Sequence, residues 1–219
     1  MKNTLYFILV FAMIYVLGSC RPYKHGPIMN QKNIQKTFTP LIQAFGLKPG
    51  TVYADIGAQN GLYDVAFATL TQGVTYYIQD IDQAALKELD RVLRYYTKKS
   101  GRPIAQDNQF HSVLGTTKQT NLPDDTFDVI HSNATFHAIR HKRAIIQDIF
   151  TKLKPGGYFF IRDEFVKNGV VKWCPSKECN ARLATEEELL AVMATTDFKL
   201  VKKYPDYDGY PMYKFQRPE

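Results

Sequence analysis

The sequence contains few cysteines, a single tryptophan and no acidic residue in its first 54 positions. Three cysteines in 219 residues, Cys20, Cys174 and Cys179, are too few for the disulfide framework of a small secreted domain. No internal repeat or low-complexity tract is present, which argues against a repeat architecture. A chain of this length, with 45% hydrophobic and 22% charged residues, can bury the core of one ordinary globular domain.

The missing acidic residues make the charge of the chain strongly uneven. Six basic residues precede Asp55, so +6 of the net charge of +7 lies there, and 22 basic residues face 21 acidic ones in the remainder. Non-specific binding of nucleic acid needs many basic contacts on one face. The nearly neutral body therefore predicts no nucleic-acid partner, and the basic N-terminal stretch is more typical of a segment beside a membrane surface.

The first 20 residues, MKNTLYFILVFAMIYVLGSC, have the layout of a secretory signal: a lysine, a short apolar run and small residues. The run is too short for a membrane span, which needs about 20 apolar residues. The last four residues, LGSC, resemble the lipobox of bacterial lipoproteins. This resemblance implies that residues 1–20 form a signal peptide and that Cys20 becomes the lipidated, palmitate-bearing first residue of the mature chain. The domain at 38–219, after a basic tether at 21–37, would then face the periplasm in the bacterial cell envelope.

An uncleaved N-terminal anchor is the alternative. One lysine precedes the apolar run, whereas Arg21, Lys24, Lys32 and Lys36 follow it. Basic residues favour the cytoplasmic side of a membrane. In this alternative the protein is anchored in the inner membrane and its domain is cytoplasmic.

From residue 38 onward, strand-like and helix-like segments alternate. Strands are predicted at 51–56, 74–79, 111–114, 127–132 and 158–162, and helices at 38–45, 83–98 and 142–153. Such alternation favours parallel strands with right-handed crossovers, hence a doubly wound α/β sheet. Thr185 and Glu188 form a capping-box pattern that opens a helix at 186–195. Strand-like runs at 198–204 and 210–215 then predict a closing antiparallel pair.

The segment YADIGAQNGLYD, residues 53–64, is the first strand–turn–helix of the domain. Gly57 and Gly61 allow a tight turn, and free N–H groups at the helix start can receive a carboxylate or phosphate. Asp80 ends the next strand, 19 residues beyond Gly61, where a carboxylate can accept both hydroxyls of a ribose. The loop lacks the G-x-G-x-x-G pattern of dinucleotide folds, which disfavours NAD and FAD.

Four segments together resemble the class I S-adenosylmethionine-dependent methyltransferases. They are KPGTVYADIGAQNG, YYIQDID, NLPDDTFDVIHSNATFHAI and LKPGGYFFIRDEF, in the order and spacing of that family. The resemblance covers about residues 38–215. It implies a Rossmann-like, mostly parallel seven-stranded sheet with an antiparallel C-terminal strand pair, and S-adenosylmethionine as the cofactor.

The same resemblance implies roles for particular residues. Asp55, Gly57 and Gly61 would line the methionine end of the cofactor, with backbone contacts from Ala58 and Gln59. Asp80 would hold the ribose hydroxyls, Ile81 would pack on the adenine, and His131, Ser132 and Asn133 would face the sulfonium and the acceptor. Thr116 and Thr117 stand where many relatives have an aspartate that bonds the adenine amino group.

Gln59 replaces the middle glycine of the family's loop. A carboxylate ligand needs less room than a pyrophosphate, so we expect the loop to tolerate this side chain. A degenerate site that no longer holds the cofactor is the alternative.

Methyl transfer is an in-line displacement, for which the enzyme mainly holds nucleophile and methyl carbon about 3 Å apart. A general base helps only when the acceptor carries a proton that must leave. The candidates are His131, His137, Asp163 and Glu164, each of which has an ordinary structural alternative.

Cys174 and Cys179 lie in WCPSKEC, after the fifth predicted strand. They would form a disulfide in an oxidising compartment and remain free thiols in the cytosol. Two cysteines alone do not supply the four ligands of a zinc site, so no metal is predicted.

Two functions follow from the sequence. The first is methyl transfer by a membrane-tethered, monomeric enzyme to a small-molecule or envelope acceptor that the sequence does not identify. The second is a catalytically degenerate lipoprotein that acts as a binding module, because S-adenosylmethionine is made in the cytosol.

Overall fold

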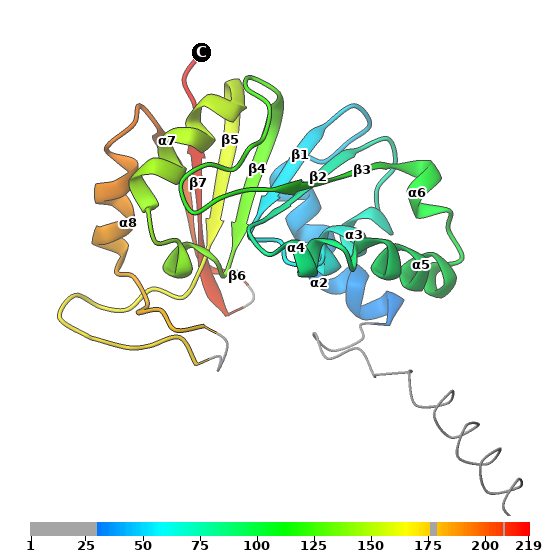
Figure 1. The fold of residues 1–219 in the computed structure, drawn as a ribbon, viewed down its shortest axis with the longest axis horizontal. Coiled ribbons are helices and arrows are strands. Elements are labelled where there is room, and N and C mark those ends of the chain that lie inside the picture. The colour runs from blue at the N-terminus through cyan, green and yellow to red at the C-terminus, as the bar shows by residue number, and fades with distance from the viewer. Residues whose placement is uncertain (1–29, 176–178, 208) are drawn as a thin grey trace, which may run out of the picture. The chain divides into compact units, whose positions relative to one another are not determined.

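The computed structural model describes residues 30–175, 179–207 and 209–219. Its centre is one seven-stranded sheet with the order β3-β2-β1-β4-β5-β7-β6 (Figure 1). The strands are β1 (Val52–Ile56), β2 (Thr75–Asp80), β3 (Gln109–Leu114), β4 (Phe127–Asn133), β5 (Leu153–Arg162), β6 (Lys199–Tyr207) and β7 (Tyr210–Gln216). The first five run parallel, and β7 pairs antiparallel with both β5 and β6. This confirms the predicted doubly wound α/β fold with its antiparallel closing pair.

The helices connect these strands. They are α2 (Gln31–Phe45), α3 (Leu62–Ala68), α4 (Gln83–Leu86), α5 (Leu89–Ser100), α6 (Ile104–Asp107), the 3-10 helix η1 (Phe136–Ala138), α7 (Lys142–Lys152) and α8 (Glu186–Met193). The single helix predicted at 83–98 is divided into α4 and α5. The predicted capping box is confirmed at the start of α8: Thr185 Oγ1 accepts from the Glu188 N–H at 3.1 Å, and Glu188 Oε2 accepts from the Thr185 N–H at 2.8 Å.

The N-terminal boundary of the domain differs from the prediction. Helix α2 begins at Gln31 rather than at 38, so residues 31–37 belong to the folded domain and not to a tether. Ile34 is only 1% exposed and shares one buried stripe with Phe38, Leu41 and Phe45. A single apolar residue among seven gives no visible period, which is why the sequence pattern missed this turn of the helix.

The predicted signal peptide, residues 1–20 with Cys20, lies outside the described residues, which begin at residue 30. Among the residues that the structure does describe, no helix is both long and apolar enough to cross a membrane. The prediction of a lipid anchor therefore stays a prediction.

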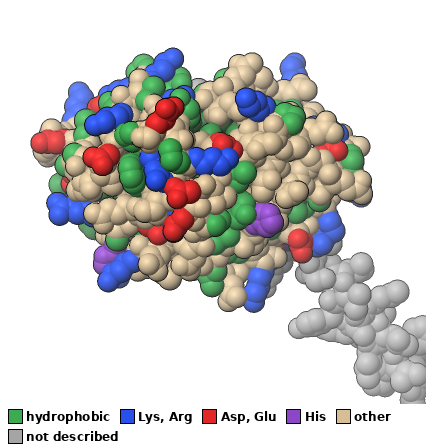
Figure 2. All heavy atoms as spheres, turned by 90° about the horizontal axis from the view of Figure 1, so that it is seen from above, with side chains coloured by type: hydrophobic (Ala, Val, Ile, Leu, Met, Phe, Trp, Pro, Cys, Tyr) green, Lys and Arg blue, Asp and Glu red, His purple; other side chains and the backbone are tan. Residues whose placement is uncertain are grey.

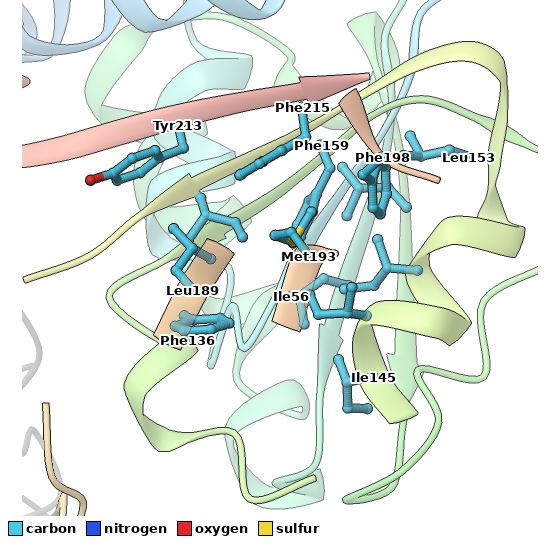
Figure 3. Packing of buried hydrophobic residues seen from close by; sticks show 14 of the residues in the cluster. Ile56, Phe136, Ile145, Leu153, Phe159, Leu189, Met193, Phe198, Tyr213 and Phe215 are labelled. Carbon is cyan, nitrogen blue, oxygen red and sulfur yellow. The ribbon is translucent and has the colours of Figure 1, made fainter. Parts of the chain in front are cut away.

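Apolar side chains cover both faces of the sheet. On one face, α7 and α8 pack against alternate residues of the central strands, including Ile56, Phe159 and Phe215 (Figure 3). On the other face, Phe38 and Phe45 of α2 contact Phe67 of α3 through edge-to-face ring contacts. The alternation of strand side chains between two faces explains why these strands are apolar at nearly every position.

The sheet also places the candidate site. The chain moves outward from β1 through β2 to β3, and then returns to β4 on the other side of β1. In open α/β sheets, ligands bind beyond the carboxyl ends of the strands where the strand order reverses in this way. Asp55 of β1 pairs in register with Ile78 of β2 and with His131 of β4, so the loops after these three strands meet at one edge.

Candidate cofactor and acceptor site

The loop after β1 turns against the end of β4. Gly57 has a φ of +75°, and a Cβ built on it would lie 2.3 Å from Cγ2 of Thr135 and 2.6 Å from its Oγ1. Only glycine fits both this backbone conformation and this space. The sequence pattern identified Gly57 but gave no signal that Thr135 is the residue packed against it.

Gln59 keeps the turn of the loop although it is not glycine. Its φ is +52°, in the left-handed region, and its side chain is exposed. This conformation costs a residue with a Cβ roughly 1–2 kcal/mol. Its N–H donates to Oδ2 of Asp80 at 2.7 Å, so the loop after β1 is bonded to the end of β2.

The backbone N–H groups of this loop are used within the protein. Those of Gly57 and Ala58 donate to the carbonyl oxygen of Gln79 at 2.9 and 3.0 Å, and Oδ1 of Asn60 accepts from the N–H of Leu62 at 3.2 Å. Asn60 was not singled out by the sequence pattern. These N–H groups are therefore already bonded within the protein, and the prediction that free N–H groups at the helix start receive a ligand stays a prediction.

Buried carboxylates add to the acceptor character of the loop. Asp55 is 4% exposed, and its Oδ1 has no hydrogen-bond partner among the described residues. Burial raises the pKa of Asp55 well above its usual range, and the nearby carboxylates of Asp64 and Asp80 raise it further. A positive charge close by favours the ionised form of such a buried carboxyl group, so Asp55 suits a cationic ligand.

Asp64, on α3, is a carboxylate that sequence reasoning missed. Its side chain is fully buried, and burial is the main cause that raises its pKa to about 7. In the sequence it looks like an ordinary acidic residue in the first turn of a helix. Only the fold shows that this position faces inward, close enough to Asp55 for their charges to interact.

The end of β2 presents a carboxylate beside an apolar surface. Asp80 accepts from the N–H of Asp82 through Oδ1 at 2.8 Å, in addition to its bond from Gln59 through Oδ2. Ile81 is 57% exposed, which is unusual for a large apolar side chain in this domain. This pair complements a nucleoside, because the carboxylate can accept from the sugar hydroxyls and the apolar side chain can pack on the flat face of the base.

Thr116 and Thr117 lie beyond the end of β3, and both are exposed. The hydroxyl oxygen of Thr116 accepts from the N–H groups of Lys118 and Gln119 at 3.2 and 3.0 Å. The residue therefore closes a local turn, as threonine often does. The predicted contact of these two threonines with the adenine stays a prediction.

His131 is buried in the core on the α2 side of the sheet. Its Nδ1 lies 3.2 Å from the hydroxyl of Tyr53, and its ring packs 4.8 Å from that of Phe45, centre to centre. Burial, with a smaller contribution from the positive charge of Arg162, lowers the pKa of His131 to about 3. The ring is therefore neutral at physiological pH, and its packing favours the structural alternative over a role as base.

The two residues after His131 differ in their surroundings. Ser132 is buried, and Asn133 at the end of β4 accepts from Nη1 of Arg162 through Oδ1 at 2.7 Å. Arg162 ends the neighbouring strand β5. This bond fixes the amide of Asn133 at the edge where the acceptor is expected.

The structure brings His137 and Asp163 together from the ends of β4 and β5. Nδ1 of His137 lies 2.8 Å from Oδ1 of Asp163, and Nε2 lies 3.2 Å from Sγ of Cys179. The hydrogen bond to Asp163 is the main cause that raises the pKa of His137. Glu164 instead pairs with Lys172 in an exposed ion pair.

No disulfide joins Cys174 and Cys179 in the structure. The disulfide predicted for an oxidising compartment thus stays a prediction for that condition.

The architecture and the glycine loop define the protein as a member of the class I methyltransferase fold. The family described as "Methyltransferase domain" matches residues 30–203, and the chain belongs to it. S-adenosylmethionine is the cofactor of this class, and the residues present fit it: the buried Oδ1 of Asp55, which has no hydrogen-bond partner among the described residues, suits a cationic group, and Asp80 beside Ile81 suits a nucleoside.

Individual proteins show how far the similarity extends. The chain is 31% identical over 128 residues to a phosphoethanolamine N-methyltransferase of Triticum aestivum, and 25% identical over 128 residues to phosphoethanolamine N-methyltransferase 1 of Arabidopsis thaliana. Each alignment covers 58% of this chain but only 23% and 24% of those proteins, so the chain spans about a quarter of their length.

Solved structures share the fold at low sequence identity. A SAM-dependent methyltransferase from Aquifex aeolicus has a TM-score of 0.62 and 18% identity, over 86% of this chain and 99% of that one. The cyclase SpnF has a TM-score of 0.66 and 13% identity, over 90% and 85% of the two chains. A cyclase among these neighbours shows that the fold alone does not fix the reaction.

Proposed function

We propose that this protein transfers a methyl group from S-adenosylmethionine to an acceptor held beyond the ends of β4 and β5. The observation that carries the proposal is the acidic loop at the end of β1, where Asp55 is buried and its Oδ1 has no hydrogen-bond partner among the described residues. When bound, the cofactor supplies a methyl carbon activated by a positively charged sulfur.

The residues of the chain then have distinct tasks. Asp55 and the carbonyl oxygens of its loop attract the cationic methionine end, because a carboxylate with a raised pKa is stabilised by a positive neighbour. Asp80 accepts the ribose hydroxyls, and Ile81 offers an apolar surface to the adenine. Together these contacts hold the methyl carbon in a fixed position, which is most of what such a transfer requires.

For the acceptor, we propose a small molecule or envelope component that reacts through a nitrogen lone pair. His131 is buried and neutral, and Nε2 of His137 faces Cys179, so neither is placed as a free general base. A neutral amine needs no base before it attacks. The names of the two plant relatives, both N-methyltransferases, support the same class of acceptor.

The charges on the face of the molecule drawn in Figure 2 do not favour a nucleic-acid acceptor. Figure 2 shows one face of the molecule, on which acidic and basic side chains are interspersed. This agrees with the 22 basic and 21 acidic residues from Asp55 onward.

We also propose that the protein is held at a membrane through lipid on Cys20, with the domain in the cell envelope. The support is the sequence alone: the apolar run, the small residues and the cysteine that follow one another at 5–20. Incorporation of labelled palmitate should occur in the wild type and vanish in Cys20→Ala. Incorporation that is unchanged in this variant would leave the uncleaved anchor with a cytoplasmic domain as the remaining explanation.

The second candidate is a binding module that has lost turnover. The exposed Thr116 and Thr117, where relatives have an acidic residue, favour it, as do the loop N–H groups already bonded within the protein. A degenerate domain of this kind would bind the cofactor or its product without transferring the methyl group.

Calorimetry and a methyl-transfer assay, both on the full chain in detergent, together separate these candidates. We expect S-adenosylmethionine and S-adenosylhomocysteine to bind, and Asp80→Ala to lose binding of both. Labelled methyl transfer to ethanolamine or phosphoethanolamine then tests turnover. Binding without any transfer supports the binding module, and no binding of either compound contradicts both candidates.

A further inference from the structure

Three metal-ligating side chains gather beyond the ends of β4 and β5. Nε2 or Nδ1 of His137 and the Sγ atoms of Cys174 and Cys179 all lie within 4.8 Å of one another. His137 is buried, and both cysteines are partly buried. The two segments are 37 residues apart in the sequence, so only the fold brings the histidine to the thiols.

Backbone hydrogen bonds between β5 and α8 hold the segment of Cys174 beside the one that follows Cys179. The N–H of Cys174 donates to the carbonyl of Ala181 at 2.9 Å, and that of Leu183 donates to the carbonyl of Lys172 at 2.9 Å. Trp173 and Arg182 form an antiparallel bridge next to them. Four residues separate the two cysteines in the sequence, which is within the spacing of zinc-binding cysteine pairs.

Asp163 sets the orientation of the histidine. Its Oδ1 and Oδ2 lie 2.8 and 3.0 Å from Nδ1 of His137, and Oδ2 also accepts from the backbone N–H of His137 at 2.9 Å. Oδ1 accepts in addition from the N–H of Glu164 at 2.7 Å. Nδ1 thus carries the proton, and the lone pair of Nε2 is aimed at the sulfur atoms. A carboxylate behind a histidine is the usual outer partner of a zinc ligand.

We propose that His137, Cys174 and Cys179 bind one Zn²⁺ ion, with Asp163 as the positioning residue for His137. Zn–S and Zn–N bonds of about 2.3 and 2.0 Å at tetrahedral angles separate neighbouring ligand atoms by roughly 3.5–3.8 Å. The 3.2 Å between Nε2 and Sγ of Cys179 and the limit of 4.8 Å for the whole set lie on either side of this range.

Binding proceeds with loss of the two thiol protons, because only thiolates ligate the ion. Three protein ligands leave a fourth position for water or an added ligand, which is the open arrangement of a reactive zinc site rather than a closed structural one. Two cysteines by themselves argue against a zinc site. The fold supplies a histidine as the third ligand and a carboxylate that orients this histidine.

The ion would add a link between two parts of the molecule. The described parts of the segment between β5 and α8, residues 166–175 and 179–184, extend away from the sheet in Figure 1, and the Val166 N–H donates to the Ala184 carbonyl at 3.0 Å. A Zn²⁺ ion would tie its outer part to His137 in η1, at the edge where we place the acceptor. The proposal itself does not depend on methyl transfer.

The test is metal binding by the full chain, purified in detergent under reducing conditions. We expect about one zinc per chain by inductively coupled plasma mass spectrometry, as one three-ligand site requires. Cobalt should replace it with thiolate-to-metal charge-transfer bands and the intense visible bands of a tetrahedral site. Cys174→Ser and Cys179→Ser should each abolish the zinc content, and Asp163→Asn should weaken binding roughly 10–100-fold.

The matched control is His111→Ala, which removes an exposed histidine on the distant strand β3. Its metal content should equal that of the wild type. The proposal is wrong if the reduced wild type binds neither zinc nor cobalt, if bound cobalt shows no thiolate bands, or if both cysteine variants keep their zinc. The wild-type measurements decide the matter even if a variant fails to fold.

Discussion

Replacing Gly57 by alanine tests the geometry of the cofactor loop most directly. The new Cβ would overlap Cγ2 and Oγ1 of Thr135, at 2.3 and 2.6 Å. The left-handed conformation at φ +75° costs alanine about 1–2 kcal/mol, and overpacking typically costs about 1–3 kcal/mol more. We therefore expect Gly57→Ala to lower the free energy of unfolding by roughly 2–5 kcal/mol and to weaken cofactor binding.

Two further variants separate these contributions. Gly46 has a similar φ of +69° but nothing within 4 Å of its Cβ position, so Gly46→Ala should lose only the conformational part, about 1–2 kcal/mol. Adding Thr135→Ala to Gly57→Ala removes both overlapping atoms and should restore most of the packing part.

Urea denaturation of the four proteins, with Thr135→Ala alone to close the cycle, measures both parts. Calorimetry on the same proteins reports the affinity for S-adenosylmethionine. The close contact between these two loops is not what makes glycine necessary if Gly57→Ala lowers the free energy of unfolding no more than Gly46→Ala does. The same conclusion holds if adding Thr135→Ala to Gly57→Ala restores none of the lost free energy.

Substitutions at three other positions test the carboxylates and the loop. Asp80→Asn keeps the shape but removes the charge, so cofactor affinity measured by calorimetry should fall by a factor of about 10–100, equal to roughly 1.5–3 kcal/mol for a charge-assisted hydrogen bond. Burial raises the pKa of Asp64 from 3.8 to about 7, so this group contributes stability that is complete at low pH and is lost as pH rises to about 7. The free energy of unfolding of the wild type should consequently fall by roughly 2–3 kcal/mol between about pH 5 and pH 8, and this fall should be absent in Asp64→Asn. Gln59→Gly should leave cofactor affinity within a few-fold of the wild type, whereas Gln59→Val should lower stability by about 1–2 kcal/mol in urea denaturation.

Each of these has an outcome that contradicts it. Unchanged affinity in Asp80→Asn would mean that the ribose is not held there. A pH dependence that persists in Asp64→Asn must come from another group, such as Asp55, whose pKa is also raised. Equal stability of the glycine and valine variants at 59 would mean that this residue leaves the left-handed region.

Much of the fold could be read from the sequence because its apolar segments have the period of a strand or a helix and are separated by turn residues. The capping box of Thr185 and Glu188 sits where the pattern places it, and the antiparallel closing pair is confirmed. The first turns of α2 were missed because they bury only Ile34.

The site was less predictable because its contacts join distant segments. The buried state of Asp64, the contact of Thr135 with Gly57 and the approach of Cys179 to His137 depend on which residues the sheet brings together. A residue's type and spacing do not carry that information. The internal use of the loop N–H groups likewise depends on where the end of β2 lies.

The bond between the N–H of Gln59 and the carboxylate of Asp80 links the two halves of the proposed cofactor site. One residue belongs to the loop expected to hold the amino-acid end, and the other is expected to hold the sugar. A ligand that draws Asp80 into place also fixes the loop of Gln59, and the converse holds by thermodynamic reciprocity. Adenosine and methionine, offered as separate fragments, should therefore each improve the binding of the other, so that the whole cofactor is recognised as one unit.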